Sequence, residues 1–310
     1  MIIIEKLLKN RIFAYCAAVF CTLLWGTAFP FIKLGYREFG VSDGDLGAKL
    51  VFAGARFMIA GIIVYVFLCV RQKKPALIKK DELVPILSLG LVQTAGQYMF
   101  TYIGIGLTSG TATSIITACA SFFTVGLAAI FFRNEKITFL KVIGCVIGFG
   151  GVLTINSFGF GEAGSLLGDG LILCSTICAA FGNIIAKKSA NKVDPVKLTA
   201  FQLMIGAAIL LIAGLVMGGR LDLAKTNGVL ILLWLAFVSA AAFTIWTALL
   251  KFHPAAKISV FNLLVPIFGT ILSGLVLGEN VLKPETFISL ALISAGIILV
   301  NITKRGETDG

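Results

Sequence analysis

The chain has 310 residues, of which 58% are hydrophobic and only 13% are charged, and its formal net charge is +11. Soluble globular proteins carry about 25% charged residues, so this composition excludes a water-soluble protein and indicates that lipid surrounds most of the chain. The excess of Lys and Arg does not indicate nucleic-acid binding, because these residues lie in short clusters between long apolar stretches, as in cytoplasmic membrane loops.

Stretches without a charged residue predict the membrane-spanning helices, because a helix needs roughly 20 apolar residues to cross the hydrocarbon core. In chain order, such stretches occur at 12–32, 83–132, 142–161, 170–186, 198–219, 226–250, 258–278 and 286–303. The stretch 83–132 is long enough for two helices with a turn at Gly104–Gly110, and 50–70, interrupted by Arg56, adds a tenth. None alternates as β-barrel strands do, so we expect an all-α integral membrane protein with ten transmembrane helices.

The distribution of Lys and Arg predicts the orientation of these helices. If the N-terminus is cytoplasmic, 19 of the 26 Lys and Arg residues fall in cytoplasmic loops and termini, and six fall in the outer loops. Cytoplasmic loops carry an excess of basic residues in membrane proteins generally. We therefore expect a multi-pass protein with both termini in the cytoplasm.

Two glutamates, Glu135 and Glu279, follow long apolar stretches in the same setting, 144 positions apart. The residues that follow them also match, at a spacing of 145: Ile143 with Ile288, Gly151 with Gly296 and Asn156 with Asn301. The sequence therefore predicts two copies of a five-helix unit, at 12–156 and 166–303. Because five is an odd number, the second copy is inverted in the membrane, and inverted repeats are typical of transporters that alternate access around a midplane site.

Several motifs within this pattern carry a resemblance to a known family. The chain has "WG" at Trp25, "ARF" from Ala55 and "VPIFGTILSGLVLGE" from Val265, and with its ten helices in two copies it resembles the drug/metabolite transporter superfamily, EamA type. The similarity covers about 12–303. It implies a carrier of the plasma (inner) membrane that moves amino acids or related small metabolites, often as an exporter.

The two copies depart from the family pattern at two positions. Ser121 stands where the first copy would usually carry the proline that Pro266 supplies in the second, and Gln202 stands at the position that Arg56 holds in the first copy. The resemblance therefore does not imply a symmetric gating mechanism.

Polar and aromatic residues inside the apolar helices are the candidates for contact with a solute. Residues at a spacing of three or four share one helix face, and an amide that loses its water partners in lipid costs roughly several kcal/mol. A cavity is one solution, but Ser and Thr also bond to their own helix or pack between helices, so both roles stay open. The substrate-binding candidates are Trp25, Gln93, Gln97, Tyr98, Tyr102, Thr117, Ser121, Asn183, Trp246 and Asn262.

A second set of residues is expected to act in gating or in structure. Pro30 and Pro266 each remove a backbone hydrogen bond and can kink a helix. Arg56 lies inside the second helix, where it can reach outward to the interface, pair with a carboxylate or bind an anion. Glu135 and Glu279 end their helices beside basic residues, either as exposed helix-end residues or as parts of a gate.

No catalytic, metal-binding or cofactor-binding residues are expected. No Asp or Glu lies at mid-span, the seven cysteines have no His or carboxylate to complete a metal set, and there is no phosphate-binding loop. The expected partners are a small-molecule substrate and the lipid bilayer, without nucleic acid. The GxxxG pattern at Gly144–Gly148 predicts close helix packing, either within the chain or in a homodimer.

The expected function is secondary-active transport of a small metabolite by alternating access, and the protein is not expected to be an enzyme. Two alternatives remain open at this point. A channel would show no saturable exchange, and an intramembrane enzyme would need a nucleophile with a base, or a metal set, at mid-depth.

Overall fold

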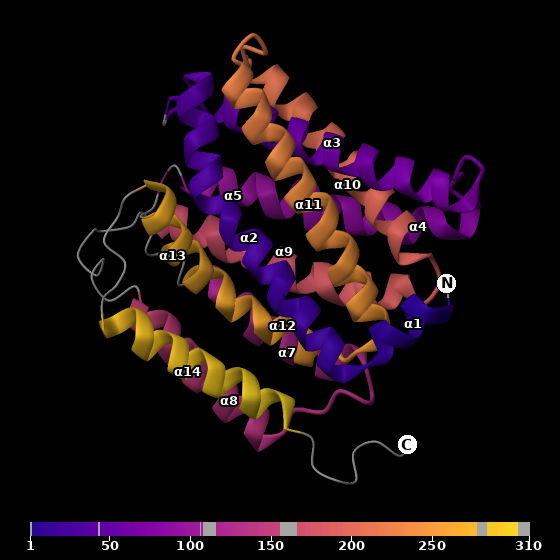
Figure 1. The fold of residues 1–310 in the computed structure, drawn as a ribbon, viewed down its shortest axis with the longest axis vertical. Helices are drawn as coiled ribbons and strands as arrows, with labels where there is room; N and C mark the ends of the chain where they lie inside the picture. Colours follow the sequence, from indigo (N-terminus) through magenta and orange to yellow (C-terminus); the bar gives the residue numbers. More distant parts are fainter. Residues whose placement is uncertain are drawn as a thin grey trace.

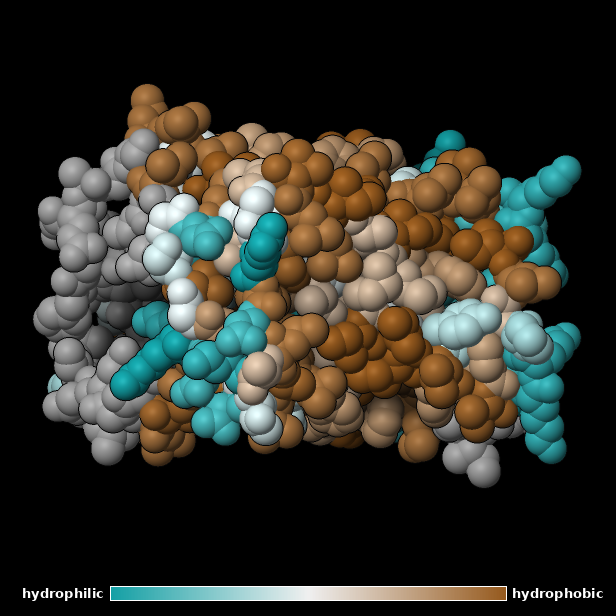
Figure 2. Space-filling view, turned by 90° about the horizontal axis from the view of Figure 1, so that it is seen from above, coloured by the Kyte–Doolittle hydropathy of each residue, from teal (hydrophilic) through white to brown (hydrophobic). Residues whose placement is uncertain are grey.

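The computed structural model describes residues 2–42, 44–105, 107, 116–155, 166–277 and 284–302, and no strand occurs among them. The helices pack against one another as a bundle, with the α8 and α14 pair along one side (Figure 1). Figure 2 shows a broad hydrophobic band across the middle of one face, with hydrophilic residues gathered toward its ends. This distribution matches a protein whose middle lies in lipid and whose ends lie in water.

The described helices follow the chain in the order that the apolar stretches predict. Those of the first half are α1 (Ile2–Lys9), α2 (Arg11–Phe39), α3 (Leu46–Gln72), α4 (Lys80–Leu89), the π-helical turn η1 (Gly90–Gly96), α5 (Gln97–Ile105), α7 (Ala120–Phe131) and α8 (Phe139–Ile155). Those of the second half are α9 (Leu166–Ala190), α10 (Pro195–Val216), α11 (Thr226–Phe252), α12 (Ala255–Ser259), the 3₁₀ segment η3 (Val260–Leu264), α13 (Val265–Leu277) and α14 (Pro284–Asn301).

Ten apolar helical segments in the described residues correspond to the ten predicted transmembrane helices. Six are long and apolar enough to cross a membrane: Arg11–Phe39, Leu46–Gln72, Lys80–Gly104, Leu166–Ala190, Pro195–Val216 and Thr226–Phe252. Four are shorter: Ile116–Phe131, Phe139–Thr154, Ala255–Gly269 and Phe287–Asn301. The prediction of an all-α integral membrane protein is confirmed.

The helix boundaries differ from the charge-free stretches, most clearly at the first transmembrane helix. The sequence predicts residues 12–32, but α2 continues to Phe39 and includes Lys33 and Arg37. Long basic side chains extend toward water from a helix end, so a charge does not have to end the helix. At the other end, the Asn10 side chain accepts hydrogen bonds from the amides of Ile12 and Phe13 and caps the helix.

Two of the transmembrane segments are not regular α-helices along their whole length. The third contains η1 between α4 and α5, and the ninth contains η3 between α12 and α13. Pro266 is the second residue of α13, which begins where η3 ends, as expected of a proline that marks a break. Pro30 behaves differently, because α2 continues through it from Arg11 to Phe39.

The closest helix pairs are α3 with α10 and α8 with α14. The second pair lies side by side in Figure 1, and its backbones meet at glycines. A Cβ atom on Gly296 would lie 2.5 Å from the carbonyl oxygen of Gly144 and 2.8 Å from the Cα of Gly148. The GxxxG pattern therefore provides close helix packing within the chain, the first of the two roles that the sequence leaves open.

Candidate functional site

Aromatic side chains from four helices meet at the centre of the bundle. The Trp25 ring of α2 lies edge-on against Phe243 and Trp246 of α11, with centroid distances of 5.5 and 5.0 Å. Phe57 of α3 continues the series, at 6.3 Å from Phe243 and 4.4 Å from Tyr98 of α5. These rings form one continuous aromatic cluster, which we call the central aromatic cluster.

Arg56 lies beside the central aromatic cluster and is only 2% exposed. Its Nε donates a hydrogen bond of 2.9 Å to the hydroxyl of Ser239, and its guanidinium carbon lies 4.7 Å from the centroid of the Phe57 ring. Three tyrosines also lie within range of its charge: Tyr36, Tyr98 and Tyr102. Arg56 thus neither reaches the surface nor forms an ion pair with a carboxylate of the described residues.

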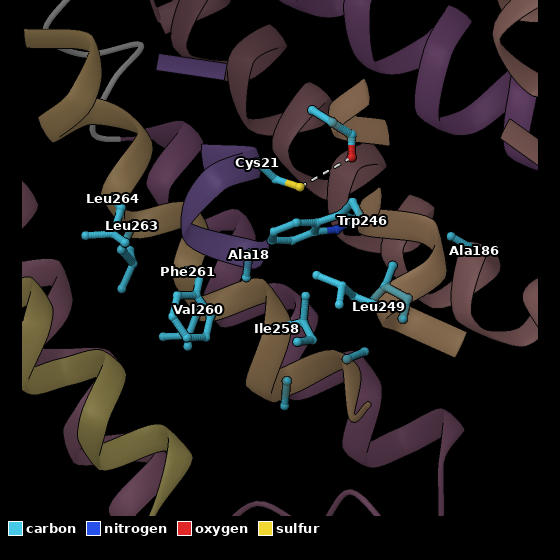
Figure 3. Packing of buried hydrophobic residues seen from close by; sticks show 14 of the residues in the cluster. Ala18, Cys21, Ala186, Trp246, Leu249, Ile258, Val260, Phe261, Leu263 and Leu264 are labelled. Carbon is cyan, nitrogen blue, oxygen red and sulfur yellow. Dashed lines mark hydrogen bonds between the residues drawn. The ribbon is translucent and has the colours of Figure 1, made fainter. Parts of the chain in front are cut away.

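Trp246 is fixed by a chain of hydrogen bonds that crosses three helices. Its indole nitrogen donates to Asn183 Oδ1 of α9 at 3.0 Å, and Asn183 Nδ2 donates to the hydroxyl of Thr124 of α7 at 3.3 Å. The indole lies next to Ala18 and Cys21 of α2, among the packed apolar residues of Figure 3. Trp246 and Asn183 therefore have packing and hydrogen-bonding roles in addition to any contact with solute.

Several buried polar atoms have no hydrogen-bond partner among the described residues. They are Trp25 Nε1, the Tyr36 hydroxyl, Gln93 Oε1, Gln202 Nε2 and Asn262 Oδ1, together with others farther along the helices. Buried polar groups in proteins are nearly always bonded to protein or to water. Trp25, Gln93 and Asn262 were predicted from the sequence to contact solute, and their unbonded atoms fit that role.

The remaining predicted substrate-binding residues take other positions. The Ser121 hydroxyl donates to the carbonyl of Ser259 at 2.9 Å and so joins α7 to α12. Gln97 is half-buried, and its backbone carbonyl accepts a hydrogen bond from Thr101. Thr117 is half-buried at the start of the fourth transmembrane segment. Tyr102 is buried, with its ring centroid 6.4 Å from that of Tyr98.

Glu135 is not the exposed helix-end residue that its position suggests. It is 3% exposed, and its carboxylate accepts hydrogen bonds of 2.8 and 3.0 Å from the amides of Ala255 and Ala256, the first residues of α12. Its charge partner is Lys187 of α9, at 3.3 Å, rather than one of its basic neighbours in sequence. A carboxylate at a helix N-terminus is stabilised by the free amides and the helix dipole. Glu279 lies outside the described residues.

The Glu135 ion pair belongs to a larger polar cluster at one end of the bundle. Lys187 Nζ donates to the carbonyl of His253 at 2.6 Å, and the carbonyl of Leu8 in α1 accepts from His253 Nε2 at 2.7 Å. The Glu135–Lys187–His253 cluster connects α1, α7, α9, α11 and α12. A second buried ion pair, Glu82 with Lys197, joins α4 to α10 nearby.

Sequence reasoning missed some of the residues in these two clusters. Tyr36 lies beyond the apolar stretch that predicted the first helix, so its place near Arg56 had no sequence signal. Phe57 was visible as part of the "ARF" motif, yet its contacts were not. Lys187 and Lys197 looked like loop charges because each lies at the edge of an apolar stretch.

No described group of three His, Cys, Asp or Glu side chains is close enough to hold a metal ion.

The sequence matches one family model twice, over residues 12–157 and 166–302, and that model describes the EamA-like transporter family. The chain belongs to the EamA-like transporter family. This membership confirms the resemblance noted from the sequence, and the protein is a membrane-spanning transporter.

Curated relatives of this EamA-like transporter have similar lengths. The uncharacterized transporter YvbV of Bacillus subtilis (strain 168) is 29% identical over 297 residues, which cover 93% of this chain and 91% of the relative. The uncharacterized inner membrane transporter YedA of Escherichia coli (strain K12) is 25% identical, with coverages of 91% and 88%. A solved crystal structure matches with a TM-score of 0.78 at 16% identity, covering 94% of this chain and 97% of its own, which shows a shared fold.

Proposed function

We propose that this transporter is a secondary carrier that moves a small metabolite across the plasma (inner) membrane by alternating access. The moving parts are the two five-helix units at 12–156 and 166–303, related as an inverted repeat. The substrate is an amino acid or a related compound, in line with the resemblance to EamA-type carriers, and the direction is export. The observation that carries this proposal is the way in which the helices of the two units pair.

Each contact between a helix of one unit and a helix of the other has a counterpart in which the two units swap roles. The second helices of the units, α3 and α10, pack together, and so do the fifth helices, α8 and α14. The first helix of each unit packs against the third of the other, since α2 contacts α11 and α9 contacts α5. Two units related by a two-fold axis in the membrane plane would produce this pattern, and such units can rock against each other around a central site.

The centre of the bundle suits a solute with both polar and apolar parts. The aromatic rings supply apolar surface, and Arg56 and the indole of Trp25 supply hydrogen-bond donors that the described residues do not fully use. The irregular segments η1 and η3 support the same proposal, because non-helical backbone at membrane depth occurs where it is buried in protein or lines a cavity.

We also propose that both termini are cytoplasmic. The basic segments at 71–80, 133–141 and 187–197 meet at one end of the structure through ion pairs: Arg71 with Asp194, Glu82 with Lys197, and Lys187 with Glu135. Near the end of α14, Asn301 Nδ2 lies 3.5 Å from the carbonyl of Lys257 and so joins the same end. An end rich in Lys and Arg is expected to face the cytoplasm.

Counterflow in proteoliposomes tests the carrier mechanism. Vesicles that contain the purified protein are loaded with a mixture of the twenty common amino acids, and uptake of each labelled amino acid from outside is followed over time. A carrier produces a transient accumulation of label above equilibrium and a saturable rate. Flux that rises linearly with concentration, without accumulation, would indicate a channel, and a new chemical product detected by mass spectrometry would indicate an enzyme.

A further inference from the structure

Arg56 carries a positive charge that the described residues leave largely uncompensated. A guanidinium has five N–H donors, and Arg56 makes one hydrogen bond, from Nε to Ser239. Its two terminal nitrogens make no hydrogen bond to a described residue. The contact with the Phe57 ring stabilises the charge only modestly. Burying an ion costs several kcal/mol, so the aromatic contact alone does not balance the burial.

The described surroundings of Arg56 are aromatic rings and neutral polar groups, without a carboxylate. Trp25 Nε1 is buried without a hydrogen-bond partner, and an indole nitrogen can only donate. The Tyr36 hydroxyl lies within range of the Arg56 charge and next to Tyr102, so it is not counted among the unused donors. The central aromatic cluster connects Trp25 to the ring that Arg56 covers. A buried cation whose terminal N–H donors find no acceptor among the described residues forms a site that an anion would complete.

We propose that Arg56 binds the carboxylate of the transported solute, while the central aromatic cluster contacts the apolar part of the same molecule. A guanidinium matches a carboxylate because two parallel N–H groups meet two oxygens. The terminal nitrogens, which make no hydrogen bond to the described residues, are the ones available for this pairing. A single guanidinium balances one negative charge, so the solute is a small monocarboxylate or an amino acid. This assignment rests on the proposed carrier function and names the feature that the carrier recognises.

The second five-helix unit does not repeat this cation. Gln202 of α10 occupies the position that corresponds to Arg56, and its Oε1 accepts a hydrogen bond of 2.6 Å from Thr94. Gln202 therefore connects α10 to η1 where Arg56 leaves its terminal nitrogens unbonded. Because Gln202 stands in place of the cation, the second unit lacks this site, and each transporter has one such anion site rather than two.

Matched carboxylate and amide probes test the assignment by binding to the purified protein, independently of transport. The probes are 4-methylpentanoate and acetate, each paired with its uncharged carboxamide, and L-leucine, paired with L-leucinamide, which lacks the carboxylate but keeps the α-ammonium; affinity is measured by isothermal titration calorimetry. We expect the wild-type protein to bind at least one of the two larger carboxylates about tenfold or more tightly than its amide. The Arg56→Gln protein should lose this preference, and Arg56→Lys should retain part of it.

Two controls separate recognition from folding. Arg37→Gln removes a charge from the exposed end of α2 and should leave the carboxylate preference unchanged. Ser239→Ala removes the one hydrogen bond of Arg56 but keeps its charge, so the preference should survive. In the absence of solute, Arg56→Gln should unfold at the wild-type temperature or higher, because it removes an uncompensated buried charge.

The outcomes distinguish this inference from the carrier function on which it rests. Equal affinity for acid and amide, or no binding of any carboxylate probe, overturns the assignment of Arg56 even if amino-acid counterflow is observed. A carboxylate preference that depends on Arg56 but comes without counterflow supports the site and overturns the carrier mechanism. A marked loss of stability in Arg56→Gln, with the preference intact in Arg56→Lys and in Arg56→Gln alike, would make Arg56 a structural residue.

Discussion

Buried polar residues in this transporter differ in whether the protein itself completes their hydrogen bonds. Asn183 is bonded on both sides, to Trp246 and to Thr124, and so ties three helices together. Trp25 and Arg56 belong to the same region but keep unused donors. The residue types alone do not separate these two cases, because the sequence shows an amide or an indole in an apolar stretch without showing its partner.

Glu135 offers a residue-scale test, because its carboxylate joins α7 to α9 and α12. Glu135→Gln leaves Lys187 buried without a counter-charge, and breaking a buried ion pair on one side costs about 3–5 kcal/mol. We therefore expect the single variant to lower the unfolding temperature of the purified protein. The double variant Glu135→Gln with Lys187→Met removes both charges and should recover much of the loss. If single and double variants lose the same stability, the ion pair does not matter to the fold.

His253 predicts a pH dependence of stability. Burial lowers the pKa of the His253 imidazole below its usual 6.5, and the nearby charges of Lys187, Arg11 and Lys257 lower it further, against the hydrogen bond to the Leu8 carbonyl. As the pH falls through about 6.5, the unfolded chain binds a proton before the folded protein does, so stability falls with pH.

The prediction from His253 is checked by the unfolding temperature at pH 7.5, 6.5 and 5.5, for the wild type and for His253→Gln. The glutamine retains a donor for the Leu8 carbonyl but does not titrate. The wild type should lose more stability than the variant between the highest and the lowest pH. Parallel profiles for the two proteins would show that other groups control the acid sensitivity.

At the scale of helices, the sequence predicts which segments exist better than it predicts their shape. A charge-free stretch has to become a helix in lipid, because its backbone groups find no water there, and all ten predicted segments are helical in the described residues. The break at η3 had a signal in Pro266. The π-helical turn η1 follows Pro85 by five residues and was not predicted; it packs against α9 and α10, helices far away in the sequence. Pro30 shows the converse, a proline that does not interrupt its helix.

The α8–α14 contact gives an element-scale prediction. Gly296→Ala places a methyl group 2.5 Å from the Gly144 carbonyl oxygen, and the obstructing atoms are backbone, so the two helices must separate. Overpacking of this kind costs about 1–3 kcal/mol, and we expect a lower unfolding temperature. Gly150→Ala on α8 is the matched control, since no atom lies within 4 Å of the added Cβ. Equal stability of the two variants would show that the helix pair tolerates separation at no cost.

At the scale of the whole molecule, most side chains at the centre of the bundle could be predicted from the sequence, but their contacts with one another could not. Trp25, Arg56, Tyr98 and Trp246 were each singled out, and they come from four helices that meet only after folding. That no described carboxylate pairs with Arg56 also depends on how the helices pack, and the sequence does not show it. Each of the three interpretations of Arg56 was compatible with its sequence position, and only the surroundings of the folded side chain separate them.

The convergence of the basic segments at one end of the bundle predicts the orientation of the whole transporter. The carbonyl of Leu8, next to the N-terminus, bonds to His253, and Asn301, near the end of α14, lies beside Lys257. Leu8 and Asn301 therefore lie at the same end of the bundle as the ion pairs of the basic segments, and that end is expected to be cytoplasmic. A fluorescent-protein fusion at Gly310 should be bright, and an alkaline phosphatase fusion there should be inactive.

The matched control for this orientation is a pair of fusions at Gly219, in the connection between α10 and α11 at the opposite end. There the phosphatase should be active and the fluorescent protein dark, because an odd number of helices precedes the junction. Active phosphatase at Gly310 would place the C-terminus outside. Inactive phosphatase at Gly219 in that case would mean that the whole ten-helix protein is inserted the other way round. Active phosphatase at both positions would mean an even number of crossings after Gly219, which is incompatible with the predicted three.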